Sequence, residues 1–153
     1  MKAINYLKQI KIMDAKINAD IDELASLEAL ATRTTSVLGG DRVQSSGSQQ
    51  KMADSVAKIV DLREQINAEI DRFIDYKQEA RELISECDAE CITLISKRYF
   101  QFKTWESIAV DMNFTYQWVS GGLHQKALAQ VQKALDEAQL LFDKLITYLI
   151  FNQ

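Results

Sequence analysis

The residues best suited to ligand chemistry lie between positions 104 and 128. Thr104 and Thr115 each precede a stretch in which apolar residues have helical spacing. A hydroxyl there can accept a hydrogen bond from an unpaired backbone N–H, so both are predicted helix N-caps. Asn113 falls at a tight turn between the two stretches, and Ala109 is small enough for two helices to cross closely. The spacing predicts a helix-turn-helix, whose second helix enters the major groove of DNA.

Four polar side chains are predicted at the exposed start of the second helix: Thr115, Tyr116, Gln117 and Ser120. Gln117 is the best candidate base reader, because its amide can form two hydrogen bonds with adenine. Candidate phosphate contacts, which would set affinity and salt dependence without reading sequence, are Arg98, Lys103, His124 and Lys126. Trp105 is expected to close the small core of the unit, with Trp118 near the edge of the DNA face.

Other chemistry has little support in the sequence. Cys87 and Cys91 are four positions apart, but no second cysteine pair exists and the only histidine, His124, is distant. Two thiolates alone do not complete a zinc site, so we expect two half-buried free cysteines. His124 has no carboxylate or cysteine nearby in the sequence and is expected on a helix surface. We find no nucleophile motif, phosphate loop or metal-spaced cluster, and we expect no catalysis and no cofactor.

The charges are unevenly distributed along the chain. The net charge is −4 overall, made up of +3 in residues 97–133, −5 in residues 1–96 and −2 in residues 134–153. A locally basic unit beside an acidic body is typical of a phosphate-facing module joined to an assembly module. Since an excess of +3 is small, the alternative interpretation is that the charges are distributed by chance over the surface of a soluble protein and do not mark a phosphate-binding face.

The composition predicts an all-α protein, because the 153 residues include no proline and apolar residues recur at three and four positions. Residues 1–86 are predicted to form an antiparallel helical hairpin with a Gly/Ser-rich loop at 36–50. Residues 87–128 form the helix-turn-helix, braced by a helix around Ile92. Residues 129–153 continue a heptad pattern into an apolar end, which we expect to pack on the hairpin or on another copy. No export signal or membrane span is predicted, which favours a cytoplasmic location.

Residues 94–128 resemble region four of sigma factors. The resemblance rests on the runs Arg98-Tyr99-Phe100, Thr104 to Ala109 and Leu123 to Leu128, with Met112 and Val119. With the preceding hairpin, the chain more closely resembles a family of small proteins of Gram-positive phages and prophages. These are similar in kind to the ArpU/RinA-type late-transcription regulators. The resemblance implies double-stranded DNA as partner, possible contact with RNA polymerase and work in a bacterial host cell.

The chain departs from that family pattern after Val119. Seven residues separate Val119 from Ala127-Leu128, one more than in the pattern, and the extra residue is best assigned to Gly121-Gly122. Each glycine inside a helix costs about 1 kcal/mol relative to alanine. We therefore expect the second helix to kink, bulge or start anew at this position.

Three functions fit these features. The first is a phage or prophage transcription regulator that binds DNA through residues 92–128 and is a monomer or dimer. The second is a DNA-packaging component like a small terminase subunit, which would form a ring of many copies. The third is a helical protein-interaction module. In this case the interruption at Gly121-Gly122 prevents the helix-turn-helix from fitting DNA, and the helices bind a partner protein. DNA binding and solution mass together distinguish them.

Overall fold

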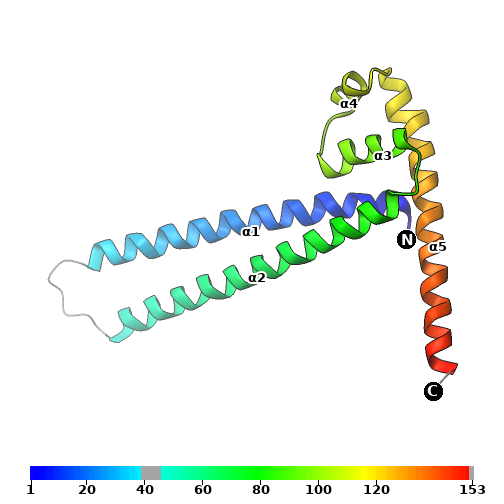
Figure 1. Ribbon diagram of the computed structural model, residues 1–153. Coiled ribbons are helices and arrows are strands. Elements are labelled where there is room, and N and C mark those ends of the chain that lie inside the picture. Colours follow the sequence, from blue (N-terminus) through cyan, green and yellow to red (C-terminus); the bar gives the residue numbers. More distant parts are fainter. Residues whose placement is uncertain (39–45, 152–153) are drawn as a thin grey trace. The chain divides into compact units, whose positions relative to one another are not determined.

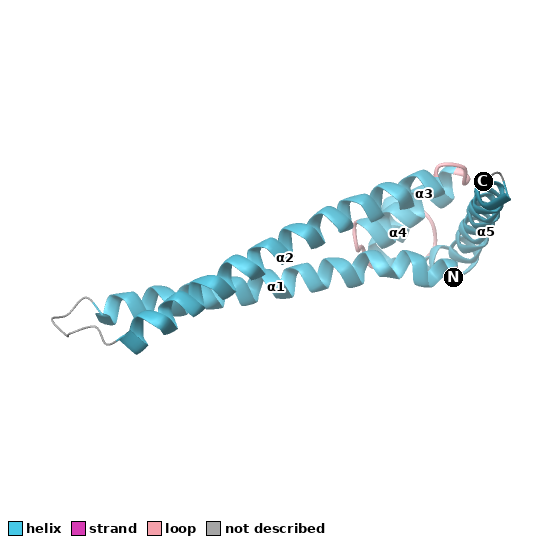
Figure 2. Ribbon diagram, turned by 90° about the horizontal axis from the view of Figure 1, so that it is seen from below, coloured by secondary structure: helices cyan, strands magenta, loops and turns pink. Residues whose placement is uncertain are grey.

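The computed structural model describes residues 1–38 and 46–151, and helices are the only regular secondary structure in these ranges. Two long helices come first, α1 (Ala3–Leu38) and α2 (Ser46–Ile84) (Figure 1). They are followed by α3 (Ala89–Ile95), a π-helical turn η1 (Ser96–Phe100), α4 (Trp105–Met112), a second π-helical turn η2 (Trp118–Gly122) and α5 (Leu123–Phe151). The predicted all-α class is confirmed, as Figure 2 illustrates.

The long helices extend into the segment predicted as a loop at 36–50. Helix α1 continues to Leu38 and α2 begins at Ser46, while residues 39–45 lie outside the described part of the chain. Hydrogen bonds between residues four apart support the early turns of α2. Gln50 donates to the Asp54 carboxylate at 3.0 Å, and the Ser55 hydroxyl donates to the Lys51 carbonyl at 2.9 Å. The pair of Gln50 and Asp54 favours helix at the end of a segment whose composition predicts a loop.

The chain divides into two compact units. Unit 2 is residues 13–74, in which the two long helices lie side by side. Ion pairs of Lys16 with Glu69 and of Glu28 with Arg63 join the helices. Between them the apolar side chains Ile17, Ile59 and Ile66 are buried. The burial of these isoleucines contributes more to the pairing of the two helices than the ion pairs do, because exposed ion pairs add little stability.

Unit 1 combines residues 1–12 with residues 75–153, and therefore draws on all three segments that the sequence analysis treated as domains. Its core consists of small and branched apolar side chains from both ends of the chain. Its buried members are Ala3, Leu7, Ile84, Cys91, Leu94, Ile95, Tyr99, Ile108, Ala109, Val119, Leu123, Ala127 and Val131. Cys91, expected to be half-buried, is fully buried here, whereas Cys87 is partly exposed. The start of α1 is thus part of the helix-turn-helix core.

Hydrogen bonds from α5 fix the first residues of the chain against this core. The Gln132 side-chain oxygen accepts a bond from the Ala3 backbone N–H at 2.8 Å, and its nitrogen donates to the Met1 carbonyl at 3.2 Å. Nearby, the Tyr76 hydroxyl donates to the Tyr6 carbonyl at 2.9 Å. One unpaired backbone N–H at the start of α1 is therefore satisfied by α5, and the first turns of α1 are also bonded to α2 within unit 1.

No helix within residues 1–38 and 46–151 is long and apolar enough to cross a membrane.

Candidate nucleic-acid interface

Helix α4 and its turn have the local geometry predicted from the sequence. The Thr104 hydroxyl accepts a hydrogen bond from the Ser107 backbone N–H at 3.3 Å, which caps the helix. Asn113 ends it in the left-handed conformation, with φ 56° and ψ 42°. Asparagine tolerates this conformation better than most residues, which explains its use at the turn. Ile108 and Ala109 are buried against the helices behind α4.

The second helix of the unit begins at Tyr116 and contains the π-helical turn η2. The Thr115 hydroxyl accepts a hydrogen bond from the Trp118 backbone N–H at 3.3 Å, so the predicted second cap is also formed. A π-helical turn accommodates one extra residue within an otherwise regular helix. Val119 before the turn and Leu123 and Ala127 after it are all fully buried. The interruption predicted at Gly121-Gly122 is therefore a bulge, and it restores the inward orientation of Ala127.

The two glycines of the turn have different surroundings. A Cβ atom on Gly122 would lie 2.4 Å from the ring of Trp118, whereas one on Gly121 would meet nothing within 4 Å. The Trp118 ring lies over Gly122, and a side chain there would force the ring to move. Of the two glycines, only Gly122 therefore lies in a place where an added side chain would displace a neighbour.

The start of the second helix presents two free polar side chains. Thr115, Tyr116 and Gln117 are exposed, while Ser120 is partly buried. The Ser120 hydroxyl donates to the Tyr116 carbonyl at 2.7 Å, and the Thr115 hydroxyl is used in the cap. Tyr116 and Gln117 are therefore the two candidate readers whose side chains form no hydrogen bond with the described part of the chain.

Three aromatic side chains are exposed in the segment from the turn to the second helix, and two of them, Phe114 and Trp118, were not predicted as readers. Phe114 is 36% exposed, Trp118 44% and Tyr116 45%. Phe114 was expected only at the turn and Trp118 only near the edge of the face. The sequence signal that could have found them is the run from Phe114 to Trp118, where aromatic residues alternate with polar ones around a helix start.

The predicted phosphate-contact lysines are paired with acids. Asp111 accepts hydrogen bonds from Lys103 at 2.6 Å and from Lys97 at 3.0 Å, and Lys126 pairs with Asp88 at 2.8 Å. Hydrogen bonds from Lys103 and Lys97 hold the pKa of Asp111 below its ordinary value, and hydrogen bonds from Lys126 and Gln130 do the same for Asp88. These pairs neutralise much of the local positive charge.

Arg98 lies behind the face, with its cationic group occupied. Its guanidinium donates to the Lys103 carbonyl at 2.9 Å and lies over the Trp105 ring, 4.5 Å from the ring centre. This stacking and hydrogen bond orient the loop that precedes α4. Trp105 packs against the core of unit 1, as predicted.

His124 is half-buried, and not on the open helix surface as expected. Its Nε2 atom lies 2.7 Å from the Tyr99 hydroxyl, and its ring meets the edge of Trp105 with ring centres 4.7 Å apart. Burial lowers the pKa of His124, and the positive charges of Arg98 and Lys8 lower it further. A neutral imidazole in this setting is a packing and hydrogen-bonding group, poorly suited to contact phosphate.

Acidification is expected to destabilise the protein through His124. Because its pKa in the folded state is below the ordinary 6.5, the unfolded chain binds a proton that the folded chain does not. The neutral His124 therefore contributes to the free energy of unfolding above about pH 6.5. This contribution should decrease as pH falls from about 6.5 through the pKa of His124 in the folded state. Urea unfolding at several pH values down to about 5.5, above the carboxylate range, measures the effect.

The matched control is His124→Gln, which keeps a hydrogen-bonding group facing Tyr99 but cannot titrate. Its stability should be nearly constant over the same pH window. Equal pH dependence in the wild type and the variant would contradict the assignment to His124.

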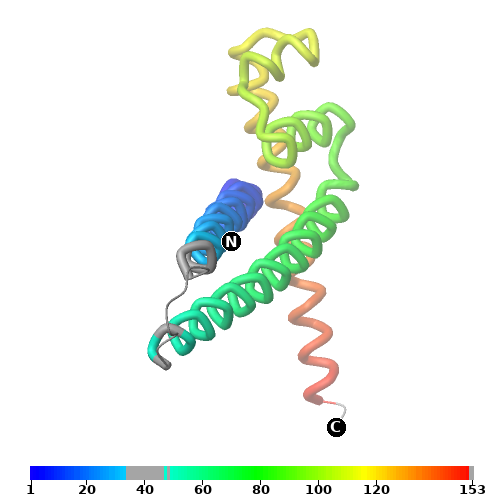
Figure 3. Tube along the Cα trace, turned by 90° about the vertical axis from the view of Figure 1, so that its left-hand side faces the viewer, coloured from blue at the N-terminus to red at the C-terminus, as the bar shows by residue number. Residues whose placement is uncertain are grey.

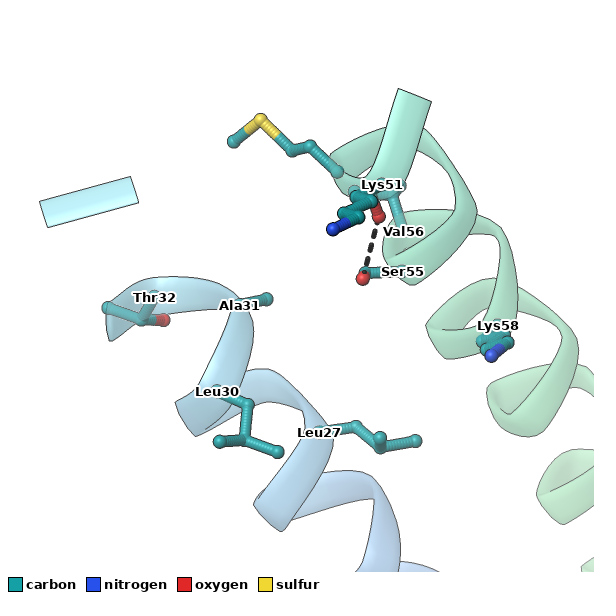
Figure 4. A pocket seen from close by; sticks show the side chains of 9 residues that line it. Leu27, Leu30, Ala31, Thr32, Lys51, Ser55, Val56 and Lys58 are labelled. Carbon is teal, nitrogen blue, oxygen red and sulfur yellow. Dashed lines mark hydrogen bonds between the residues drawn. The ribbon is translucent and has the colours of Figure 1, made fainter. Parts of the chain in front are cut away.

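Among the residues that the structure describes, no group of three or more His, Cys, Asp or Glu side chains could hold a metal ion. Figure 4 shows a cavity of about 530 Å³ in unit 2, between α1 and α2. Its lining is mainly apolar and aliphatic, formed by Leu27, Leu30, Ala31, Thr32, Lys51, Met52, Ser55, Val56 and Lys58. This lining contains no histidine, cysteine or carboxylate for acid–base work.

Comparisons with protein-family models, with curated proteins and with solved structures found no match.

Proposed function

We propose that this chain is a DNA-binding transcription regulator of a phage or prophage, which uses the helix-turn-helix of residues 92–128. The main support is the exposure of Tyr116 and Gln117 at the start of a helix whose opposite side is buried in the core. The left-handed turn at Asn113 precedes them, as the helix-turn-helix geometry requires. Gln117 would read a base, and Tyr116 would contact a base edge or a phosphate.

Phosphate binding would use Lys97 and Lys103 together. Their shared partner Asp111 leaves this group of three with a net charge of +1. A lysine ammonium has three donors, so each lysine can bind a phosphate oxygen while keeping its bond to Asp111. The carboxylate would still repel the DNA backbone, which makes Asp111 a restraint on affinity.

This arrangement predicts opposite effects from neighbouring substitutions. Lys103→Ala should weaken binding to all duplex sequences and reduce the salt slope by about 1, because one phosphate contact is lost. Asp111→Asn should strengthen binding several-fold at low salt, because it removes the repelling charge. Electrophoretic mobility shifts over a series of salt concentrations, with duplex fragments of the phage or prophage genome that encodes the protein, measure both.

Lys133→Ala is the matched control, since Lys133 lies further along α5 with an 80% exposed side chain and should have no effect. Gln117→Ala should weaken binding to the preferred fragment more than to others. Binding that does not change with salt, or that responds equally to Lys103→Ala and Lys133→Ala, would contradict the proposal.

The second candidate is a protein-interaction module without DNA binding. Two observations favour it: Lys97, Lys103 and Lys126 are all in ion pairs, and the aromatic side chains of Phe114, Tyr116 and Trp118 are exposed on one segment. Exposed aromatic residues are enriched in protein interfaces. Failure of every fragment to shift at low salt would leave this candidate in place of the regulator.

A further inference from the structure

The second half of α5 is a helix without a covering partner inside unit 1. The core of the unit reaches Val131, with Leu135 partly buried at its edge. Every residue from Glu137 to Phe151 is exposed. In Figures 1 and 3 the red end of α5 continues past the other helices of this unit.

This exposed segment is mostly apolar, and its apolar residues form a broad face. At 100° per residue, seven of them occupy one continuous arc of roughly 200° around the helix. They are Leu141, Phe142, Leu145, Ile146, Tyr148, Leu149 and Ile150, with exposed fractions between 39% and 68%. Asp143, Lys144 and Thr147 lie on the remaining side, together with the exposed apolar residues Leu140 and Phe151 near the two ends of the segment. A helix with such an arc resembles a core helix, and not a solvent-exposed one.

The width of the arc indicates how many neighbours would cover it. One packed helix needs an apolar stripe of about 100°, and a two-stranded seam is narrower still. An arc twice as wide therefore fits two neighbouring helices. The area of the arc can be compared with that of known interfaces. A large apolar side chain that is half exposed has a solvent-accessible area of roughly 100 Å². Seven of them give about 700 Å² for each copy, summed over both neighbours, which is close to the roughly 800 Å² that one partner buries in a standard interface.

The charges of the segment argue against a lipid surface as its partner. Residues 134–153 carry a net charge of −2, with Lys144 as the single basic side chain. Helices that lie on anionic membranes have basic polar faces. The continuation of the heptad spacing through Ala138, Phe142, Leu145 and Leu149 instead favours packing against other helices.

We propose that the chain assembles through residues 138–151 of α5 into a bundle of at least three copies. In a closed bundle each helix contacts two neighbours, which matches the width of the arc. Asp143, Lys144 and Thr147 would face solvent around the outside. This assembly does not depend on DNA binding. It replaces the monomer or dimer that the sequence predicts for a transcription regulator, and it leaves the contact made by Gln117 and Lys103 with DNA to be tested separately.

The test is the solution mass by light scattering, which does not depend on molecular shape. The wild-type chain should have at least three times the 17.4 kDa of one copy. Leu145→Lys, in the middle of the arc, should reduce the mass to that of a monomer. Thr147→Lys, which places the same charge on the polar side two residues away, should leave the mass unchanged.

Both variants should keep the helix content of the wild type, because the core of unit 1 does not include these positions. Circular dichroism checks this, and Leu149→Lys repeats the experiment one turn further along the arc. A wild-type monomer or dimer at all concentrations would overturn the proposal. So would a mass that the two leucine variants do not lower while they remain folded.

Discussion

Deletion of Ala129 is expected to lower the free energy of unfolding by about 3 kcal/mol or more, while deletion of Gly121 should change it by about 1 kcal/mol or less. Ala129 is an exposed residue in a regular part of α5. Its removal rotates all later residues by about 100° relative to the core. Val131 then leaves its buried position, and Gln132 loses its bonds to Ala3 and Met1.

Gly121 is different because it lies in the π-helical turn. The turn already holds one residue more than an α-helix needs, so the deletion should convert it to regular helix with Val119 and Ala127 still buried. Urea unfolding of the two deletion variants measures the difference. Comparable losses of stability in both would show that the turn does not absorb the extra residue. The deletion of Gly121 also removes one glycine from the interior of the helix, which favours the helical state.

Substitution of Ile108 by alanine is expected to have the largest effect of any single side-chain truncation in α4. Ile108 is fully buried beneath the helix-turn-helix, and removal of such a side chain costs about 2–5 kcal/mol. Val110 is 81% exposed on the same helix, so Val110→Ala should change stability by less than about 0.5 kcal/mol. Both variants place alanine at a helical position, which cancels most of the difference in helix propensity.

Thermal or urea unfolding of the two variants tests this pair. The DNA binding proposed above should be lost in the Ile108 variant under conditions where it is unfolded and kept in the Val110 variant. If Val110→Ala is as damaging as Ile108→Ala, the buried side of α4 has been assigned wrongly.

Features with local causes could be predicted from the sequence. The caps at Thr104 and Thr115 and the turn at Asn113 depend on bonds between residues three or four apart, and all three are present. The interruption at Gly121-Gly122 is local for the same reason. The sequence predicted that a disturbance would occur but left its form open, because whether a helix bulges or breaks depends on what packs on both sides of it.

The pairing of the charged residues could not be predicted, because it depends on distant segments. Lys126 meets Asp88 from 38 positions away, and His124 meets Tyr99 from 25 positions away. The pattern of apolar residues at the start of α1 predicts a helix but does not say which helices bury it. Ala3 and Leu7 therefore read as part of a hairpin, although they lie in the core of unit 1.

The bond between Ala3 and Gln132 also limits when unit 1 can assemble. Its two residues are 129 positions apart, so the first turn of α1 has no partner on α5 until most of the chain has left the ribosome. Long-range contacts of this kind slow folding, because a large loop must close before they form. Unit 2 lies inside that loop, and its two helices pair close to its two ends, where Ile17 and Ile66 are buried and Lys16 is ion-paired with Glu69. Early pairing of these helices would shorten the effective loop, so that the long helices guide the two chain ends to a common core.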